Sequence, residues 1–185
     1  QTLLRFELHG PAEQAFNREV LERLVRDDLT GLYTRRKFEL ELEGVVEQAG
    51  REDVPMCLLV LDIDGLKAVN DAHGHLAGAR VIAETGRTIA RTLPPSAFAC
   101  RYGGDEFAVG LPRTDALGGH ALALAIVRAV DAQRIAHEGH DLSVRISAGL
   151  AVMPKDATDP VELFRIADEA LFRAKKKGGC QVETR

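Results

Sequence analysis

The sequence predicts a mixed α/β or α+β fold, because short apolar runs alternate with longer segments of helical periodicity. No internal repeat interrupts this alternation. The 185 residues are 45% hydrophobic and 28% charged, which is typical of a globular protein. A chain of this length is sufficient for one domain with one substantial core.

The beginning of the chain differs from the rest. Apolar side chains recur at helical spacing over residues 12–26, which predicts an amphipathic helix shorter than the several heptads of a coiled coil. We expect residues 1–26 to form a signalling or linker helix and residues 27–185 to form the globular domain. Since the chain begins with Gln1, we also expect an upstream sensor domain that this sequence does not include.

The first half of the globular part predicts two helical segments around one buried strand. We expect a helix from Thr34, a residue type favoured at N-caps, to about residue 49. Residues 54–65, VPMCLLVLDIDG, are a short continuous apolar run and predict a central strand buried on both faces. A helix from about Leu66 should break near the HGH of residues 73–75 and continue over residues 77–93, where the prolines of LPPSA end it.

The second half predicts a hairpin, two more helices and two more strands. Residues 98–101 and 107–111 should form strands on either side of a glycine-containing turn. An alanine-rich segment predicts a long helix over about residues 115–136, and a strand should follow over residues 143–152. A last helix is expected from Pro160 to about Lys177, and residues 180–184 should form an edge strand.

Charge, apolar runs and cysteines exclude several classes of protein. A net charge of −4 gives no general attraction to nucleic acid or an anionic membrane. The longest apolar runs are far below the roughly 20 residues that span a bilayer. Cys57, Cys100 and Cys180 have no paired spacing and predict reduced thiols of a cytoplasmic domain. The HEGH of residues 137–140 has metal-like spacing, but we expect it to lie in a polar loop without further ligands.

Residues 101–111, RYGGDEFAVGL, contain a turn that folding alone does not explain. Glycine permits positive φ and lets a ligand approach the backbone closely. A purely structural hairpin gains nothing from Asp105 and Glu106 in tandem, because adjacent acids repel each other. A solvated turn is the alternative interpretation.

A second acidic pair, Asp62 and Asp64, ends the predicted central strand, and the spacing of two puts both on one face. An unpaired carboxylate after a buried apolar run would be costly. One explanation is that Asp62 caps the next helix. The other is ligation of a hard cation such as Mg²⁺, because two carboxylate clusters on neighbouring strands could hold two ions for in-line displacement at phosphorus.

Five segments in this order resemble the GGDEF domains, the diguanylate cyclases. They are DDLTGLYTRRKF, LDIDGLKAVNDAHGHLAG, RYGGDEFAVGL, SAGLAV and ADEALFRAK. The resemblance implies an α+β sandwich, a ferredoxin-like palm with a βαββαβ core related to class III nucleotidyl cyclases. It also implies that a homodimer, each subunit presenting one GTP, makes cyclic di-GMP with Mg²⁺ or Mn²⁺ as the output domain of a bacterial signalling protein.

The resemblance assigns the metal and catalytic groups by position. Asp62, the main-chain carbonyl of Ile63, Asp105 and Glu106 would bind the metal. Asp105 or Glu106 would help deprotonate the attacking ribose hydroxyl, and Lys67 would neutralise charge in the transition state.

The resemblance also assigns the groups that contact the nucleotide. Asn70 would bind guanine, and His75 belongs to the same substrate-facing stretch. Gly103 and Gly104 would lie against the α-phosphate, while Lys175 would contact the phosphates. A solvated lysine at a helix C-terminus is the alternative for Lys175.

Three departures from the family pattern affect base recognition, phosphate binding and feedback inhibition. Ala79 stands where the family has an aspartate that binds guanine, a loss of about 1–3 kcal/mol. Gly179 replaces a phosphate-contacting arginine, and residues 94–97, PPSA, replace the inhibitory R-x-x-D. Two alternatives to a strict diguanylate cyclase follow: a related cyclase with relaxed base choice, or a degenerate nucleotide-binding module that regulates a partner domain.

Overall fold

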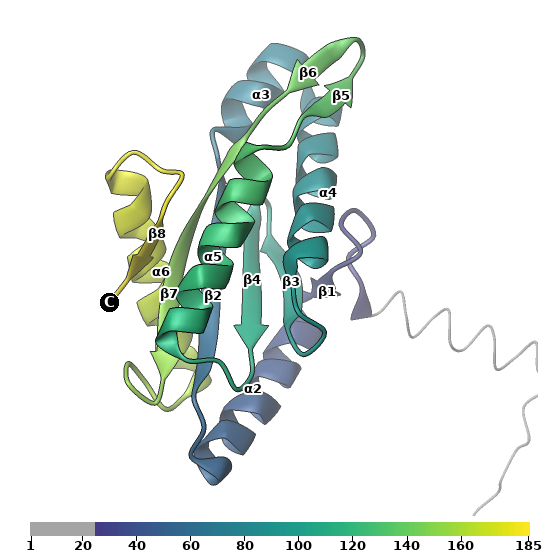
Figure 1. Cartoon of the computed structure of the whole chain (residues 1–185). Coiled ribbons are helices and arrows are strands. Elements are labelled where there is room, and N and C mark those ends of the chain that lie inside the picture. Colours follow the sequence, from purple (N-terminus) through teal and green to yellow (C-terminus); the bar gives the residue numbers. More distant parts are fainter. Residues whose placement is uncertain (1–24) are drawn as a thin grey trace, which may run out of the picture.

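A mixed six-stranded sheet forms the centre of the protein in the computed structural model, which describes residues 25–185 (Figure 1). The helix predicted over residues 12–26 therefore lies outside the described residues, apart from its last two positions. Among the described residues the helices are α2 (Arg35–Glu52), α3 (Leu66–His73), α4 (His75–Thr92), α5 (Ala116–Asp131) and α6 (Pro160–Lys176). The strands are β1 (Tyr33–Thr34), β2 (Met56–Asp64), β3 (Phe98–Gly103), β4 (Glu106–Leu111), β5 (Ile135–His137), β6 (His140–Leu142), β7 (Arg145–Met153) and β8 (Val182–Thr184).

The core of the sheet has the predicted βαββαβ topology. Strands β3, β4, β2 and β7 are neighbours in that order, and every pair among them is antiparallel. Helices α3 and α4 connect β2 to β3, and α5 connects β4 to β7. The short strands β1 and β8 extend the sheet by parallel pairing at its two edges. The predicted terminal edge strand is thus confirmed, whereas β1 was not predicted.

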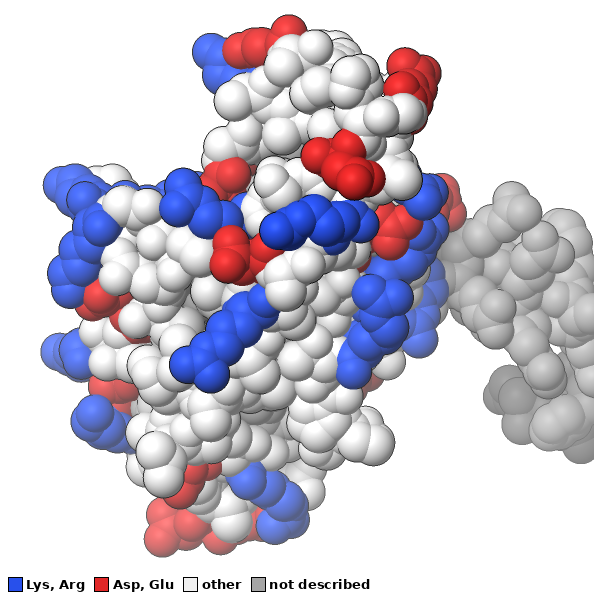
Figure 2. All heavy atoms as spheres, turned by 45° about the horizontal axis from the view of Figure 1, so that its top comes forward, with Lys and Arg blue, Asp and Glu red and all other residues white. Residues whose placement is uncertain are grey.

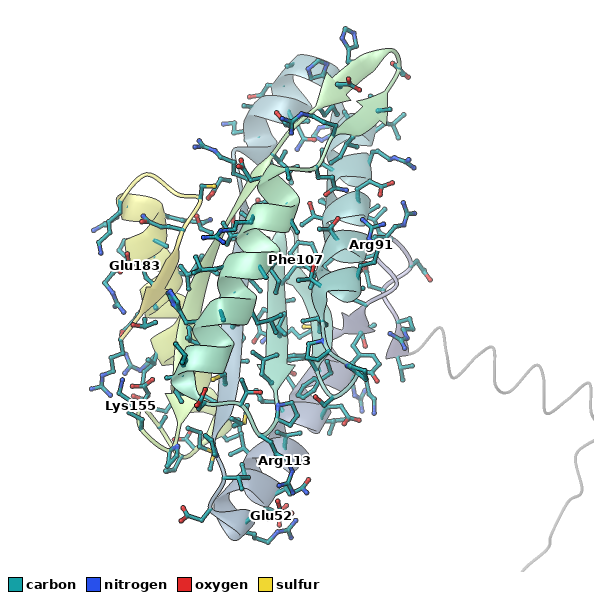
Figure 3. All side chains as sticks on the ribbon, viewed as in Figure 1. Glu52, Arg91, Phe107, Arg113, Lys155 and Glu183 are labelled. Carbon is teal, nitrogen blue, oxygen red and sulfur yellow. The ribbon has the colours of Figure 1, made fainter. Side chains whose placement is uncertain are left out.

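Helices cover both faces of the sheet, and β2 lies between the two layers. Leu59 and Leu61 of β2 belong to the hydrophobic cluster that includes α4 and α5. Leu58 and Val60 belong to the cluster formed with α2 and α6. Phe107 of β4 points into the first of these layers, between the sheet and α5 (Figure 3). Burial on both faces explains why β2 is a continuous apolar run rather than an alternating one.

The long helix predicted over residues 115–136 is wrong at its C-terminal end. Helix α5 ends at Asp131, and β5 and β6 then form a separate hairpin. Ile135 and Leu142 are almost fully buried against the α4–α5 layer, and burial of these side chains overrides the helix propensity of the alanines. Residues 137–140, expected in a loop, are the ends of these two strands and their turn.

The break between the two helices after β2 lies at Gly74, whose φ of +83° favours glycine, and this break was predicted. All three cysteines are free, with Cys57 and Cys100 buried and Cys180 half-buried, which confirms the prediction of unpaired thiols. In the described part of the chain, no helix is both long and apolar enough to cross a membrane.

Gly149 of the SAGLAV segment provides a test of this packing. A Cβ at this position would lie 2.0 Å from the carbonyl oxygen of Ala167 and 2.3 Å from the nitrogen of Leu171, so the backbone of α6 rests directly on β7. We predict that Gly149→Ala lowers the free energy of unfolding by about 3 kcal/mol, because a backbone contact cannot move aside for one methyl group.

The matched control is Gly44→Ala on α2, where a Cβ meets nothing within 4 Å. Alanine favours a helix interior, so this variant should be neutral or more stable by up to about 1 kcal/mol. Urea denaturation of both variants measures the difference, and equal stability of the two would contradict the packing described here.

Candidate active site

The predicted site residues gather at the end of the sheet where β2 meets the β3–β4 turn, the upper end in Figure 1. An open pocket of about 410 Å³ lies there. Its lining residues are Asp62, Ile63, Asp64, Gly65, Leu66, Lys67, Asp105, Lys175, Gly178 and Gly179. A pocket of about 440 Å³ between α2 and α6 contains none of the predicted site residues.

Strand register brings the two acidic segments together. Asp62 at the end of β2 is paired with Glu106 at the start of β4. The N–H of Ile63 donates a hydrogen bond to the carbonyl oxygen of Asp105 at 3.2 Å. Since the N–H and C=O of one strand residue point to the same side, the carbonyl of Ile63 also faces the turn. The four predicted metal-binding groups therefore lie together, two on β2, one at the start of β4 and one in the turn that precedes it.

Asp62 is a nearly buried carboxylate, with 7% of the residue exposed. Its Oδ1 lies 2.5 Å from Nζ of Lys175, the last-turn lysine of α6. This contact is an ion pair, and Oδ1 has no further hydrogen-bond partner among the described residues. Burial raises the pKa of Asp62 to about 6; Lys175 lowers it, and the charges of Asp105 and Glu106 raise it further.

Asp64 lies on the same face as Asp62, as predicted, but its carboxylate has hydrogen-bond partners within the chain. It accepts hydrogen bonds from the hydroxyl of Ser147 at 2.8 and 2.9 Å and from the backbone N–H of Cys180 at 2.8 Å. Asp64 therefore ties the segment after α6 to the end of β2. The helix-cap explanation for Asp62 is wrong, because the N-cap of α3 is Gly65.

The two glycines of the turn differ in what the fold requires of them. Gly104 has a φ of +47°, a conformation that favours glycine, and its carbonyl accepts a hydrogen bond from Arg101 at 2.8 Å. Gly103 has no positive φ, and a Cβ there would meet only the Glu106 carboxylate, at 4.0 Å. Neither backbone conformation nor crowding among the described residues requires glycine at position 103.

Four of the predicted site residues, one catalytic and three for substrate binding, come from α3 and α4. Lys67 is exposed on the first turn of α3 and lines the pocket. Asn70 is half-buried, and its Oδ1 lies only 1.9 Å from where a Cβ on Gly78 would be. Ala79 follows Gly78 and is half-buried, whereas His75 is exposed at the start of α4. Asn70, His75 and Ala79 thus lie on the neighbouring helix pair and not in the pocket lining.

Sequence reasoning missed the structural role of Gly179. This residue has a φ of +72°, and a Cβ would lie 2.8 Å from Oδ2 of Asp64. Glycine at this position therefore fits the turn that Asp64 holds. The serine of the SAGLAV segment was the available signal, because Ser147 is buried and donates to that same carboxylate.

The donor set fits a hard divalent cation. Carboxylates and a main-chain carbonyl are the ligands that Mg²⁺ prefers, together with water and phosphate oxygens. The buried Oδ1 of Asp62 has the Lys175 ammonium as its single partner in the described part of the chain, so this position already accommodates a positive charge. Among the described residues, no three acidic, histidine or cysteine side chains already converge on one point, so phosphate or water oxygens would have to complete the coordination shell.

This topology and the acidic turn define a palm-type α+β domain with a candidate site for phosphates and cations. The sequence profile of the family described as "Diguanylate cyclase, GGDEF domain" matches residues 24–181, and the chain belongs to this family. The resemblance noted from the motifs is thereby confirmed.

Similar proteins agree with this assignment. The chain is 38% identical over 160 residues to the uncharacterized protein YhcK of Bacillus subtilis, covering 84% of this chain and 44% of that protein. It is 35% identical over 164 residues to the probable diguanylate cyclase DgcT of Escherichia coli, covering 86% and 35%. The chain therefore spans less than half the length of these curated relatives.

A solved structure confirms the predicted palm. It contains the coiled coil and GGDEF domain of DgcB from Caulobacter crescentus in complex with c-di-GMP. The two structures agree with a TM-score of 0.85 at 30% sequence identity, over 93% of this chain and 91% of that chain.

The raised pKa of Asp62 predicts a dependence of stability on pH. Its value of about 6, against 3.8 for an ordinary aspartate, means that the folded state binds this proton more tightly than the unfolded state. The contribution of Asp62 to wild-type stability should therefore fall as the pH rises from about 4 to about 6 and remain lower above that range. Asp62→Asn lacks this loss, so the variant should gain stability over the wild type as the pH rises.

Thermal unfolding in the presence of EDTA, at about pH 4.5 and about pH 7.5, measures this difference. Asp71→Asn, which removes an exposed carboxylate from α3, is the control. An advantage of Asp62→Asn that is the same at both pH values would contradict the assignment of the buried charge.

Proposed function

We propose that the chain is a diguanylate cyclase domain that condenses two GTP into cyclic di-GMP and releases two pyrophosphates. The observation that most supports this proposal is the presence of glycine at position 103. Neither φ nor crowding among the described residues demands a glycine there, and strand register pairs Gly103 with Glu106, which is itself paired with Asp62. A glycine that admits a phosphate next to cation-binding acids is what phosphoryl transfer requires.

Asp62, the Ile63 carbonyl, Asp105 and Glu106 would hold Mg²⁺ or Mn²⁺. A bound divalent cation lowers the pKa of the ribose 3′-hydroxyl and shares the charge of the phosphates. The 3′-oxygen of one GTP attacks the α-phosphorus of the other, and the bond from that phosphorus to the pyrophosphate oxygen breaks. Asp105 or Glu106 accepts the hydroxyl proton, and pyrophosphate leaves with the bonding electrons. A second transfer closes the ring.

Side chains around the pocket would position the nucleotide. Lys67 is exposed at the start of α3, where its ammonium can neutralise charge on the transferred phosphate. Asn70 presents an amide to the base from the same helix, and His75 lies at the start of the next one. Figure 2 shows acidic and basic side chains interspersed over the face that it displays, so recognition by local groups is favoured over recognition by a broad basic surface.

One pocket of this kind serves one GTP, so the reaction requires two copies that face each other, and we include a homodimer in the proposal. The coverage of less than half of the curated relatives supports an output domain within a longer signalling protein, acting in the cytoplasm with a sensor domain upstream.

Ala79 favours a second candidate, a cyclase of the same class that also accepts ATP. Its methyl group cannot accept a hydrogen bond from guanine, and it directly follows the glycine that Asn70 contacts. Discrimination between the two purines would then rest on fewer polar contacts.

Asp105→Ala should abolish the formation of cyclic di-GMP, because it removes both a cation ligand and a candidate proton acceptor. Asp105 lies in a turn and packs in neither hydrophobic cluster, so folding should be retained. Mass spectrometry of the products from Mg²⁺ and GTP measures activity, and circular dichroism checks the fold. Asp71→Ala is the control, and near-normal turnover by Asp105→Ala would remove the catalytic assignment.

Ala79→Asp should raise the preference for GTP over ATP by roughly 5- to 150-fold, the equivalent of about 1–3 kcal/mol for one buried polar partner. Product analysis with GTP, ATP and an equimolar mixture gives the ratio for the variant and the wild type. An unchanged ratio would show that position 79 does not face the base.

A further inference from the structure

We propose that Lys175 is an exchangeable counter-ion: it neutralises Asp62 before ligands bind, and it transfers to the triphosphate when the metal takes its place. Metal and nucleotide would then strengthen each other's binding through one lysine. The inference rests on the proposed function, because it takes Asp62 as a metal ligand.

The ion pair itself is the first observation. Nζ of Lys175 lies 2.5 Å from Oδ1 of Asp62, the nearly buried atom that has no further hydrogen-bond partner among the described residues. A cation at Oδ1 must therefore displace the ammonium. In the described part of the chain, no other ion pair involves Asp62, Asp105 or Glu106, so Lys175 alone supplies a paired positive charge to this acidic cluster.

The second observation is the difference in freedom between the two partners. The side chain of Asp62 is 10% exposed and that of Lys175 is 38% exposed, so the aspartate is enclosed while the lysine borders solvent and has room to move. Lysine carries its charge on a flexible four-carbon stem, which suits a change of partner more than a guanidinium fork does.

The backbone that carries Lys175 is fixed, so only its side chain has to move. The N–H of Gly178 donates to the carbonyl of Lys175 at 3.1 Å, and the N–H of Gly179 donates to that of Ala174, also at 3.1 Å. The N–H of Cys180 is held by Asp64 at 2.8 Å. The end of α6 is thereby attached to β2, and the ammonium stays within reach of the pocket in either state.

The neighbouring lysines of α6 do not share this position. Lys176 lies over the ring of Phe172, and Lys177 pairs with Glu183. Lys176 therefore offers a control that removes the same charge from the next residue without opening Oδ1 of Asp62.

Exchange of partners has a thermodynamic consequence. Lys175 competes with the metal for one oxygen atom, and a triphosphate that binds Lys175 removes the competitor. Because coupling between two ligands is reciprocal, the metal must favour the triphosphate by the same factor.

The first experiment titrates the full chain with Mn²⁺ in the absence of nucleotide and follows free Mn²⁺ by electron paramagnetic resonance. Lys175→Met should bind Mn²⁺ about tenfold more tightly than the wild type, within the usual range of coupling between sites. Lys176→Met should stay within about twofold of the wild type. Asp62→Asn should bind Mn²⁺ more weakly than the wild type, whether or not Lys175 is also replaced.

The outcomes separate the two proposals. If Asp62→Asn weakens Mn²⁺ binding but Lys175→Met matches Lys176→Met, the exchange is overturned and the metal assignment stands. If Asp62→Asn leaves Mn²⁺ affinity unchanged, the metal assignment fails and the exchange fails with it.

A second experiment measures binding of a non-hydrolysable GTP analogue in EDTA by calorimetry. Asp62→Asn frees Lys175 for the triphosphate, whereas Asp105→Asn removes an equal charge and leaves the ion pair intact. The analogue should therefore bind more tightly to Asp62→Asn than to Asp105→Asn, and replacing Lys175 as well should abolish the difference. Equal affinities of the two single variants would overturn the exchange.

Discussion

The complete enclosure of β2 determines where this domain can carry charge. The strand pairs with β4 and β7 along its edges, and helices cover both of its faces. An ionised side chain in the middle of such a strand would be costly, so charged side chains are confined to its last three residues. Asp62 lies at this boundary and remains nearly buried, which is why its charge needs a cation. The start of α3, the acidic turn and the end of α6 all meet at that one point.

Much of this arrangement follows from the sequence, because periodicity and turn residues are local signals. The apolar run of β2, the shared face of Asp62 and Asp64, and the break at Gly74 were all predicted on that basis. The adjacency of Asp62 and Glu106 depends on strand register, and the motifs suggested it only through resemblance. Register is set by packing across the sheet, so the separate partners of the two aspartates, Lys175 and Ser147, could not be derived.

Where prediction failed, contacts distant in sequence outweighed local preference. The alanines after Asp131 favour a helix, but Ile135 and Leu142 gain more by packing against the core as a hairpin. Strand β1 has only two residues and is defined by its pairing with β3. Two residues are too few for an alternation of apolar and polar side chains, so the sequence could not predict this strand. Gly179 is another such case. The sequence shows only that glycine stands where the family pattern has an arginine. The structure adds that this position has a positive φ and lies against Asp64, and both features favour glycine.

The backbone contact between Gly149 and α6 limits how this domain can change shape. At Gly149 no side chain separates β7 from α6, so a sliding or tilting movement of the helix would separate backbone atoms that touch there. Since β7 pairs with β2 along its whole length, the strand that carries Asp62 and the helix that carries Lys175 are packed as one unit. Bending within this unit would break backbone packing, so displacement of the unit as a whole is the less costly response to a force applied from outside.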